Sequence, residues 1–176
     1  MILYFLRHAS AGEHFINPKK DEKRPLDKEG IEQCGYIGRA LTALDVQVDV
    51  IVTSPLKRCT QTAALVGNEL GYEGKLQLDT GLRPEAGLAD FRRLLEKYAR
   101  LEAIMVVGHN PNLSQFLGAV ICESGCEASL ELKKGAVAKV EMRRTSGTLQ
   151  WCFTPKVLRS LYDTAVESSR PKTSRK

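Results

Sequence analysis

The sequence predicts a three-layer α/β/α sandwich, with a mostly parallel sheet and an antiparallel hairpin at its C-terminal edge. Short runs dominated by apolar residues, at 1–6, 49–53 and 103–107, are typical of strands buried on both faces of a parallel sheet. A segment with apolar residues at helical spacing comes after each of them. In residues 136–142 and 148–153, apolar and polar side chains instead alternate. No helix is expected between the two segments, which predicts a β-hairpin.

The first run ends abruptly at Arg7 and His8. In open α/β sheets, ligands bind at the carboxyl ends of the strands. A guanidinium can hold a tetrahedral oxyanion through two hydrogen bonds, and an imidazole can attack phosphorus or shuttle a proton. Taken alone, this stretch leaves the alternative of a strand end whose Arg and His side chains face solvent.

Residues 11–24 form a polar loop that is longer than most strand-to-helix connections, a feature typical of functional loops. We interpret His14 as a surface residue, because the loop offers it no evident partner. Pro25 fixes the backbone after Arg24 and can hold that guanidinium in a set direction. Asp27 is the predicted N-cap of the first helix. The apolar stripe of this helix comprises Ile31, Cys34, Ile37 and Leu41.

The second strand, residues 49–53, leads into Ser54 and Pro55, which favour the N-cap and the first helical position. We therefore expect a helix to begin here, with Cys59, Ala63, Val66 and Leu70 buried. Arg58 falls in its first turn, where a cation opposes the helix dipole. An anion bound at this helix N-terminus would reconcile that placement; a solvated Arg58 is the alternative.

Residues 76–78 predict a short strand, and residues 88–98 an amphipathic helix. The strand at 103–107 ends in Gly108 and His109, followed by Asn110, which can cap the next helix, and Pro111, which can open it. Residues 157–166 predict a terminal helix after the hairpin.

The 176 residues suggest one catalytic domain, 1–166, followed by a basic tail, 167–176, that we expect to be disordered. From residue 156 onward there are six basic and two acidic residues, so most of the net charge of +5 lies there. The nearly neutral body argues against a nucleic-acid partner. The opening apolar run is too short for a membrane span and lacks the basic lead of a secretory signal.

Five cysteines, without the spacing of a disulfide scaffold, indicate reduced thiols in a cytoplasmic protein. Cys122 and Cys126 have no His nearby that could complete a zinc site. We expect a cytoplasmic monomer without a membrane partner.

The predicted architecture brings Arg7, His8, Arg58 and His109 to the same rim, because each belongs to the carboxyl end of a strand. Core packing does not explain such a convergence of polar side chains. Two Arg and two His around one point make a pocket for a dianionic tetrahedral group, which indicates phosphate.

Three segments resemble the histidine phosphatase superfamily in order and spacing. They are Leu6-Arg7-His8-Ala9, residues 54–63 (SPLKRCTQTA) and Val107-Gly108-His109-Asn110. The compact size and the pattern Arg24-Pro25-Leu26-x-x-x-Gly30 narrow the resemblance to the small, SixA-type phosphohistidine phosphatases. It covers residues 1 to about 153 and implies a phosphoglycerate-mutase-like fold. Ala9 departs from the Gly that much of the superfamily has at this position.

The resemblance implies that His8 is the nucleophile that takes the phosphoryl group, while Arg7, Arg58 and His109 bind its oxygens. Arg24 would be an accessory phosphate or substrate contact. The implied activity is removal of a phosphoryl group from phosphohistidine on a protein. No metal or other cofactor is implied, because the arginines supply the positive charge.

Two alternatives to a phosphohistidine phosphatase stay open. One is a phosphomonoesterase of the same superfamily that acts on a small phosphorylated metabolite. The other is a module that binds phosphorylated protein without turnover, although retention of His8 argues against it. Glu85 is the candidate general acid for an alkoxide leaving group, but it is displaced from the acidic position of the larger superfamily phosphatases.

Overall fold

The computed structural model describes residues 1–122, 128–143 and 146–168. Its strands are β1 (Ile2–Arg7), β2 (Val50–Thr53), β3 (Gln77–Leu78), β4 (Ala103–Gly108), β5 (Val137–Met142) and β6 (Gly147–Phe153). The helices are α1 (Pro18–Glu22), α2 (Lys28–Ala43), α3 (Lys57–Glu69), α4 (Leu88–Lys97), α5 (Asn112–Ile121) and α6 (Pro155–Ser168), with a short 3₁₀ turn at Thr80–Leu82. The first two residues of the predicted tail, 167 and 168, belong to α6, and the remainder, 169–176, lies outside the described residues.

The six strands form one sheet in the order β3-β2-β4-β1-β5-β6. On one side, β1 pairs in parallel with β4. The pairs β4–β2 and β2–β3 are also parallel. On its other side β1 pairs antiparallel with β5, which forms the hairpin with β6. The mostly parallel sheet with an antiparallel C-terminal edge is therefore confirmed.

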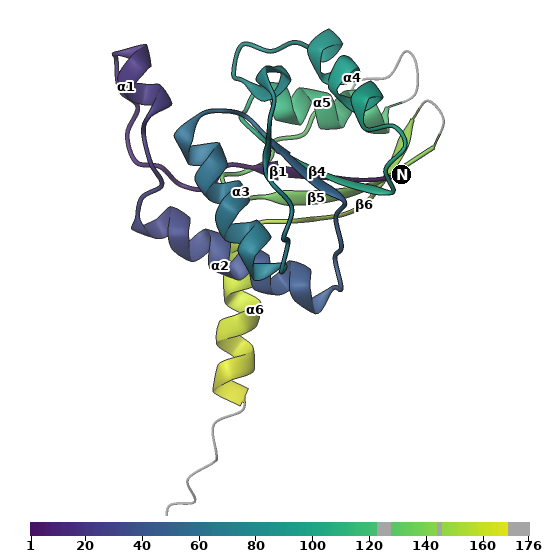
Figure 1. Cartoon of the computed structure of the whole chain (residues 1–176). Helices are drawn as coiled ribbons and strands as arrows, with labels where there is room; N and C mark the ends of the chain where they lie inside the picture. The colour runs from purple at the N-terminus through teal and green to yellow at the C-terminus, as the bar shows by residue number, and fades with distance from the viewer. Residues whose placement is uncertain (123–127, 144–145, 169–176) are drawn as a thin grey trace, which may run out of the picture.

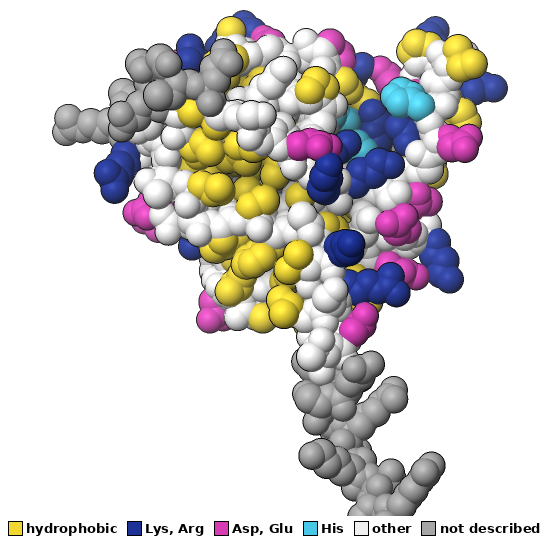
Figure 2. All heavy atoms as spheres, turned by 180° about the vertical axis from the view of Figure 1, so that it is seen from behind, with side chains coloured by type: hydrophobic (Ala, Val, Ile, Leu, Met, Phe, Trp, Pro, Cys, Tyr) yellow, Lys and Arg dark blue, Asp and Glu magenta, His cyan; other side chains and the backbone are white. Residues whose placement is uncertain are grey.

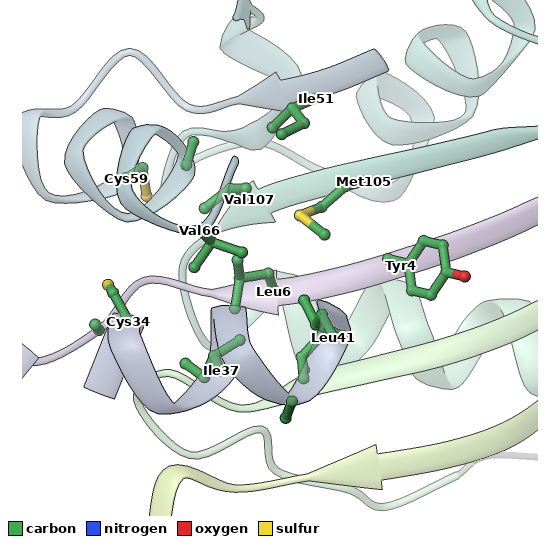
Figure 3. Packing of buried hydrophobic residues seen from close by; sticks show 14 of the residues in the cluster. Tyr4, Leu6, Cys34, Ile37, Leu41, Ile51, Cys59, Val66, Met105 and Val107 are labelled. Atoms are coloured by element: carbon green, nitrogen blue, oxygen red, sulfur yellow. The ribbon is translucent and has the colours of Figure 1, made fainter. Parts of the chain in front are cut away.

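Helices cover both faces of the sheet (Figure 1). On one face, α2 and α3 pack on the strands, and α6 packs against α2; α4 and α5 cover the other face. Figure 3 shows one of the two cores, in which Cys34, Ile37 and Leu41 of α2 meet Leu6 and Met105 of the central strands. The apolar interiors of the central strands β1 and β4 are buried from both sides, as their sequences predict.

The first turn of α2 differs from its predicted stripe. Asp27 is the N-cap, and its side chain accepts from the Gly30 N–H, but the Ile31 residue is 54% exposed. Gly30 takes the inward position, because a Cβ there would lie 2.0 Å from the Ser10 carbonyl oxygen. The prediction that Ile31 is buried was wrong, because α2 lies so close to Ser10, in the segment after β1, that only glycine fits at the inward position.

Helix α3 begins two residues after the predicted start. Its N-cap is Leu56, which makes no capping side-chain bond, and Pro55 precedes the helix. Similarly, Pro111 is the N-cap of α5, and the Asn110 amide donates to the Leu132 carbonyl instead of capping the helix. In both connections polar residues that could cap a helix face the site at the sheet edge instead.

The long loop after β1 contains the short helix α1, which the sequence did not predict. Asn17 caps it by accepting from the N–H groups of Lys19 and Lys20, and Pro18 occupies the first turn. In Figure 1 this helix projects from the body of the protein beside α3. Among the residues that the structure describes, none of the helices combines the length and apolar character needed to cross a membrane.

Candidate active site

A cavity of about 370 Å³ lies at the carboxyl ends of β1 and β4. Figure 2 shows the hollow, with histidine and basic side chains gathered beside the projecting α1 segment. Its lining comprises Arg7, His8, Gly12, His14, Arg24, Arg58, Pro84, His109, Asn110 and Lys134. All four residues expected at this rim, and Arg24, therefore share one cavity.

His8 follows β1 and is 7% exposed. Its Nδ1 lies 2.8 Å from the carbonyl oxygen of Ala9, which can only accept, so the proton is on Nδ1 and Nε2 carries the lone pair. Burial, together with the charges of Arg58 and Arg7, lowers the pKa of His8 to about 3, despite the opposing backbone bond. His8 is therefore a neutral imidazole at neutral pH, as a nucleophile must be.

The backbone after His8 is fixed against α3 by Thr62. The Ala9 N–H donates to Thr62 Oγ1 at 3.1 Å, and that hydroxyl donates to the Arg58 carbonyl at 2.7 Å. The strand end that carries His8 and the helix turn that carries Arg58 are thus linked through one buried side chain.

The Arg7 guanidinium is bound by a residue that is distant in the sequence. Its Nη1 donates to the Leu132 carbonyl at 2.7 Å, and the Asn110 amide donates to the same oxygen at 2.8 Å. The Arg7 Nε is buried and has no hydrogen-bond partner among the described residues. A buried donor without an acceptor is costly, so this atom indicates a ligand oxygen.

Arg58 is 3% exposed, so the solvated alternative is excluded. Its Nη1 lies 3.2 Å from Asp21 Oδ2 and 3.1 Å from the Asp21 carbonyl oxygen. Asp21 thereby supplies part of the negative charge that the position at a helix start requires. The Arg58 Nε stays buried without a partner among the described residues, which again indicates an anionic ligand.

Arg24 is fixed within the loop that it closes. Its Nε donates to Asp21 Oδ1 at 2.8 Å, and its Nη1 donates to the carbonyls of Ala11 and Gly12. Only its remaining Nη2 makes no hydrogen bond to the described residues. Arg24 therefore holds the loop in place and can offer one further N–H group to a ligand.

His109 is 2% exposed and faces His8, with ring centroids 5.1 Å apart. Its Nε2 lies 2.9 Å from Ser54 Oγ and 3.3 Å from Cys59 Sγ, and these contacts fix the ring. Burial, followed by the charges of His8 and Arg58, lowers the pKa of His109 to about 2. Ser54 thus orients His109 rather than capping α3.

Glu85 is not among the residues that line the cavity. Its side chain is 67% exposed and accepts from Arg83 Nε at 2.5 Å. The bond from Arg83 lowers the pKa of Glu85, which favours the carboxylate over the acid. The structure does not bring Glu85 together with the other predicted site residues.

Three residues of the site were missed or misread in the sequence. Asp21 is buried and bridges Arg24 and Arg58, and its place in a charged stretch of the sequence did not distinguish it from an exposed carboxylate. His14 is exposed, as expected, but its Nδ1 lies 3.0 Å from Asp21 Oδ1, so it has a partner. Lys134, which also lines the cavity, had no signal in the sequence.

The arrangement can bind and transfer a tetrahedral oxyanion. It combines unpaired buried guanidinium N–H groups with a neutral imidazole whose lone pair is free. Phosphoryl transfer requires positioning and charge neutralisation more than covalent assistance. Within residues 1–122, 128–143 and 146–168, no group of three or more His, Cys, Asp or Glu side chains could hold a metal ion.

Comparisons with known proteins agree with this chemistry. The family model described as histidine phosphatase superfamily, branch 1, matches residues 3–100. An uncharacterised protein of Picosynechococcus sp. is 34% identical over 123 residues, which are 68% of this chain and 73% of the relative. The phosphohistidine phosphatase SixA of Escherichia coli is 24% identical over 158 residues, covering 88% of this chain and 94% of that protein.

Among solved structures, the protein histidine phosphatase SixA complexed with tungstate superimposes with a TM-score of 0.79. The two share 21% identity, and the match covers 90% of this chain and 99% of that one. At this identity the likeness shows that the two chains share a fold.

Proposed function

The chain belongs to the histidine phosphatase superfamily, and from that premise we propose that it removes the phosphoryl group from phosphohistidine on a protein. The observation that carries the proposal is the state of His8. Its Nδ1 is bound to the Ala9 carbonyl, its Nε2 is free, and its pKa is about 3, all within a cavity of unpaired guanidinium N–H groups. The similarity to SixA supports this substrate class.

In the first step, His8 Nε2 attacks phosphorus and the P–N bond of the substrate breaks. The bonding pair stays with the substrate imidazole, which leaves as a neutral ring once its other nitrogen carries a proton. Arg7 and Arg58 hold the equatorial oxygens through their Nε groups, and His109 contributes a third contact. The product of this step is a phosphohistidine on His8.

In the second step, water attacks the phosphohistidine on His8, and inorganic phosphate leaves the cavity. The intermediate divides one displacement into two, each with an imidazole as the leaving group. Neither step requires a strong general acid, because an imidazole leaves far more readily than an alkoxide. The position of Glu85 outside the cavity is consistent with that requirement.

The experiment compares three substrates at equal concentration: a protein phosphorylated on histidine, p-nitrophenyl phosphate and a phosphoserine peptide. We expect rapid release of phosphate from the first, slow release from the second and almost none from the third. Efficient hydrolysis of the phosphoserine peptide, which is an alkyl phosphate, would favour the phosphomonoesterase instead. Binding of the phosphoprotein without any release would favour the binding module.

His8→Ala tests the nucleophile directly. The variant should lose turnover and keep the fold, since within the described part of the chain the side chain makes one hydrogen bond, to a backbone carbonyl. Quenching the parent protein with alkaline SDS during turnover of a ³²P-labelled substrate should trap phosphate on His8 that is stable in base and is released by acid. Label trapped on any other residue would overturn the assignment.

A further inference from the structure

We propose that His14, held by Asp21, is the general base that takes the proton from water when the phosphohistidine on His8 is hydrolysed. The inference rests on the proposed function, since it requires an intermediate on His8. It assigns a catalytic role to a side chain that lines the cavity and that the proposed function does not otherwise use.

The position of His14 is set by a carboxylate that is itself fixed. Asp21 is buried, and its Oδ1 accepts from the Phe15 N–H at 3.2 Å and from Arg24 Nε at 2.8 Å. The same oxygen lies 3.0 Å from His14 Nδ1. Asp21 therefore anchors His14 at the mouth of the cavity that contains His8.

The nearby carboxylate favours one tautomer of His14. A carboxylate beside Nδ1 favours the form that carries its proton on that nitrogen, which leaves the lone pair on Nε2. Hydrolases orient the imidazole of a general base with a carboxylate in the same manner. His14 thus offers a proton acceptor on the side of its ring away from Asp21.

The other side chains of the cavity do not fill this role. The arginine and lysine side chains are hydrogen-bond donors rather than acceptors. His8 carries the phosphoryl group in this step, and His109, whose Nε2 contacts Ser54, is assigned by the proposed function to a phosphoryl oxygen. Among the described residues that line the cavity, His14 is the ionisable side chain left to accept a proton.

Hydrolysis of the phosphohistidine on His8 is a displacement at phosphorus. The oxygen of a water molecule forms a bond to phosphorus while the bond from phosphorus to His8 Nε2 breaks, and the bonding pair returns to His8. The proton of the water passes to His14 Nε2, and inorganic phosphate leaves. His14 then releases the proton to solvent, which its 78% exposed side chain allows directly.

The test is the rate at which phosphorylated His8 loses its label, measured by rapid quench with ³²P-labelled p-nitrophenyl phosphate. His14→Gln removes the base, and Lys19→Gln, on the same projecting segment but outside the cavity lining, is the matched control. We expect His14→Gln to form the intermediate at a rate close to that of the parent and to lose it at least about tenfold more slowly. A slowing of about tenfold is smaller than the usual effect of removing a general base, because a loose phosphoryl transition state needs little help from a base. Lys19→Gln should match the parent in both steps.

A solvent isotope effect distinguishes a general base from a residue that has only a structural role. Dephosphorylation of the parent should slow in D₂O, and this slowing should be lost in His14→Gln. Loss of the intermediate within twofold of the parent, or an unchanged isotope effect, would overturn the role of His14. If the parent itself forms no intermediate on His8, the proposed function fails instead, so the two failures are distinguishable.

Discussion

Asp21 Oδ2 lies 3.2 Å from Arg58 Nη1, although 37 positions separate the two residues in the chain. This ion pair connects the projecting α1 segment to the first turn of α3. The other carboxylate oxygen of Asp21 binds Arg24, so a single acidic side chain aligns two basic ones. The loop after β1 is therefore part of the candidate active site.

Asp21→Asn should destabilise the protein by about 1–3 kcal/mol at neutral pH, because hydrogen bonds to two buried guanidiniums are weakened. Burial raises the pKa of Asp21, but the bonds from Arg24 and Phe15 and the charge of Arg58 outweigh it, and the net pKa is lowered. A carboxyl whose pKa is lower in the folded state contributes stability above its unfolded pKa and loses it as the pH falls. The difference in Tm between parent and variant should therefore shrink from pH 7 toward pH 3; a constant difference would contradict this.

Arg58→Ala should reduce both the affinity for phosphate and the rate. The change removes a buried charged donor whose Nε has no partner among the described residues, along with its ion pair to Asp21. We expect kcat/KM to fall by at least about a hundredfold, the usual effect of losing one preorganised donor to a developing charge. Arg58→Lys keeps the charge without the forked geometry and should recover little of the loss. Inhibition by tungstate provides the affinity, and normal values in Arg58→Ala would place the site elsewhere.

His8 and His109 should remain neutral well below the usual pKa of a histidine. Burial, followed by nearby charges, lowers the pKa of His8 to about 3 and that of His109 to about 2. Both lie below the unfolded value of about 6.5, so stability is present above that pH and is lost as the pH falls toward 3. ¹⁵N NMR should show uncharged rings at pH 5 in the free protein. Titration of either ring near pH 6.5 would contradict the burial argument.

Glu85→Gln should leave phosphohistidine hydrolysis within about tenfold of the parent, short of the loss expected for a full general acid. The side chain is exposed, bound to Arg83 and held as a carboxylate. Pro84, its neighbour, does line the cavity, so Pro84→Ala is a useful comparison for effects on shape alone. An alkyl phosphatase activity that disappears in Glu85→Gln would show that Glu85 moves into the site.

Activity should survive EDTA within about twofold. The arginines supply the positive charge that a metal ion would otherwise provide at the transferred phosphoryl group. The measurement is kcat/KM before and after dialysis against the chelator. A loss that zinc or magnesium restores would indicate a metal in the reaction.

The framework of the site could be predicted from the sequence because its signals are local. Apolar runs that stop at Arg7, His8 and His109 mark the carboxyl ends of β1 and β4, and parallel pairing brings these ends to one edge. Register along paired strands then fixes which residues are neighbours: Arg7 pairs with Gly108, directly before His109.

The remaining features of the site depend on contacts between segments that are distant in the chain, and such contacts leave no periodic pattern in the sequence. Asp21 lies in a charged stretch where nothing distinguishes a buried carboxylate from an exposed one until Arg58 and Arg24 are placed around it. Ser54 and Asn110 have the side chains of helix caps, yet both bind groups at the site. Local capping preference was outweighed there by tertiary hydrogen bonds.

The bond between Arg7 Nη1 and the Leu132 carbonyl joins residues 125 positions apart. During synthesis on the ribosome, His8 emerges early, while the backbone oxygen that holds the neighbouring guanidinium is added only much later. Domains generally fold as units once enough of the chain is available. A nascent chain that ends before residue 132 therefore contains His8 but lacks the carbonyl oxygen that fixes the Arg7 guanidinium beside it, so the candidate site is completed only after residue 132 has been added.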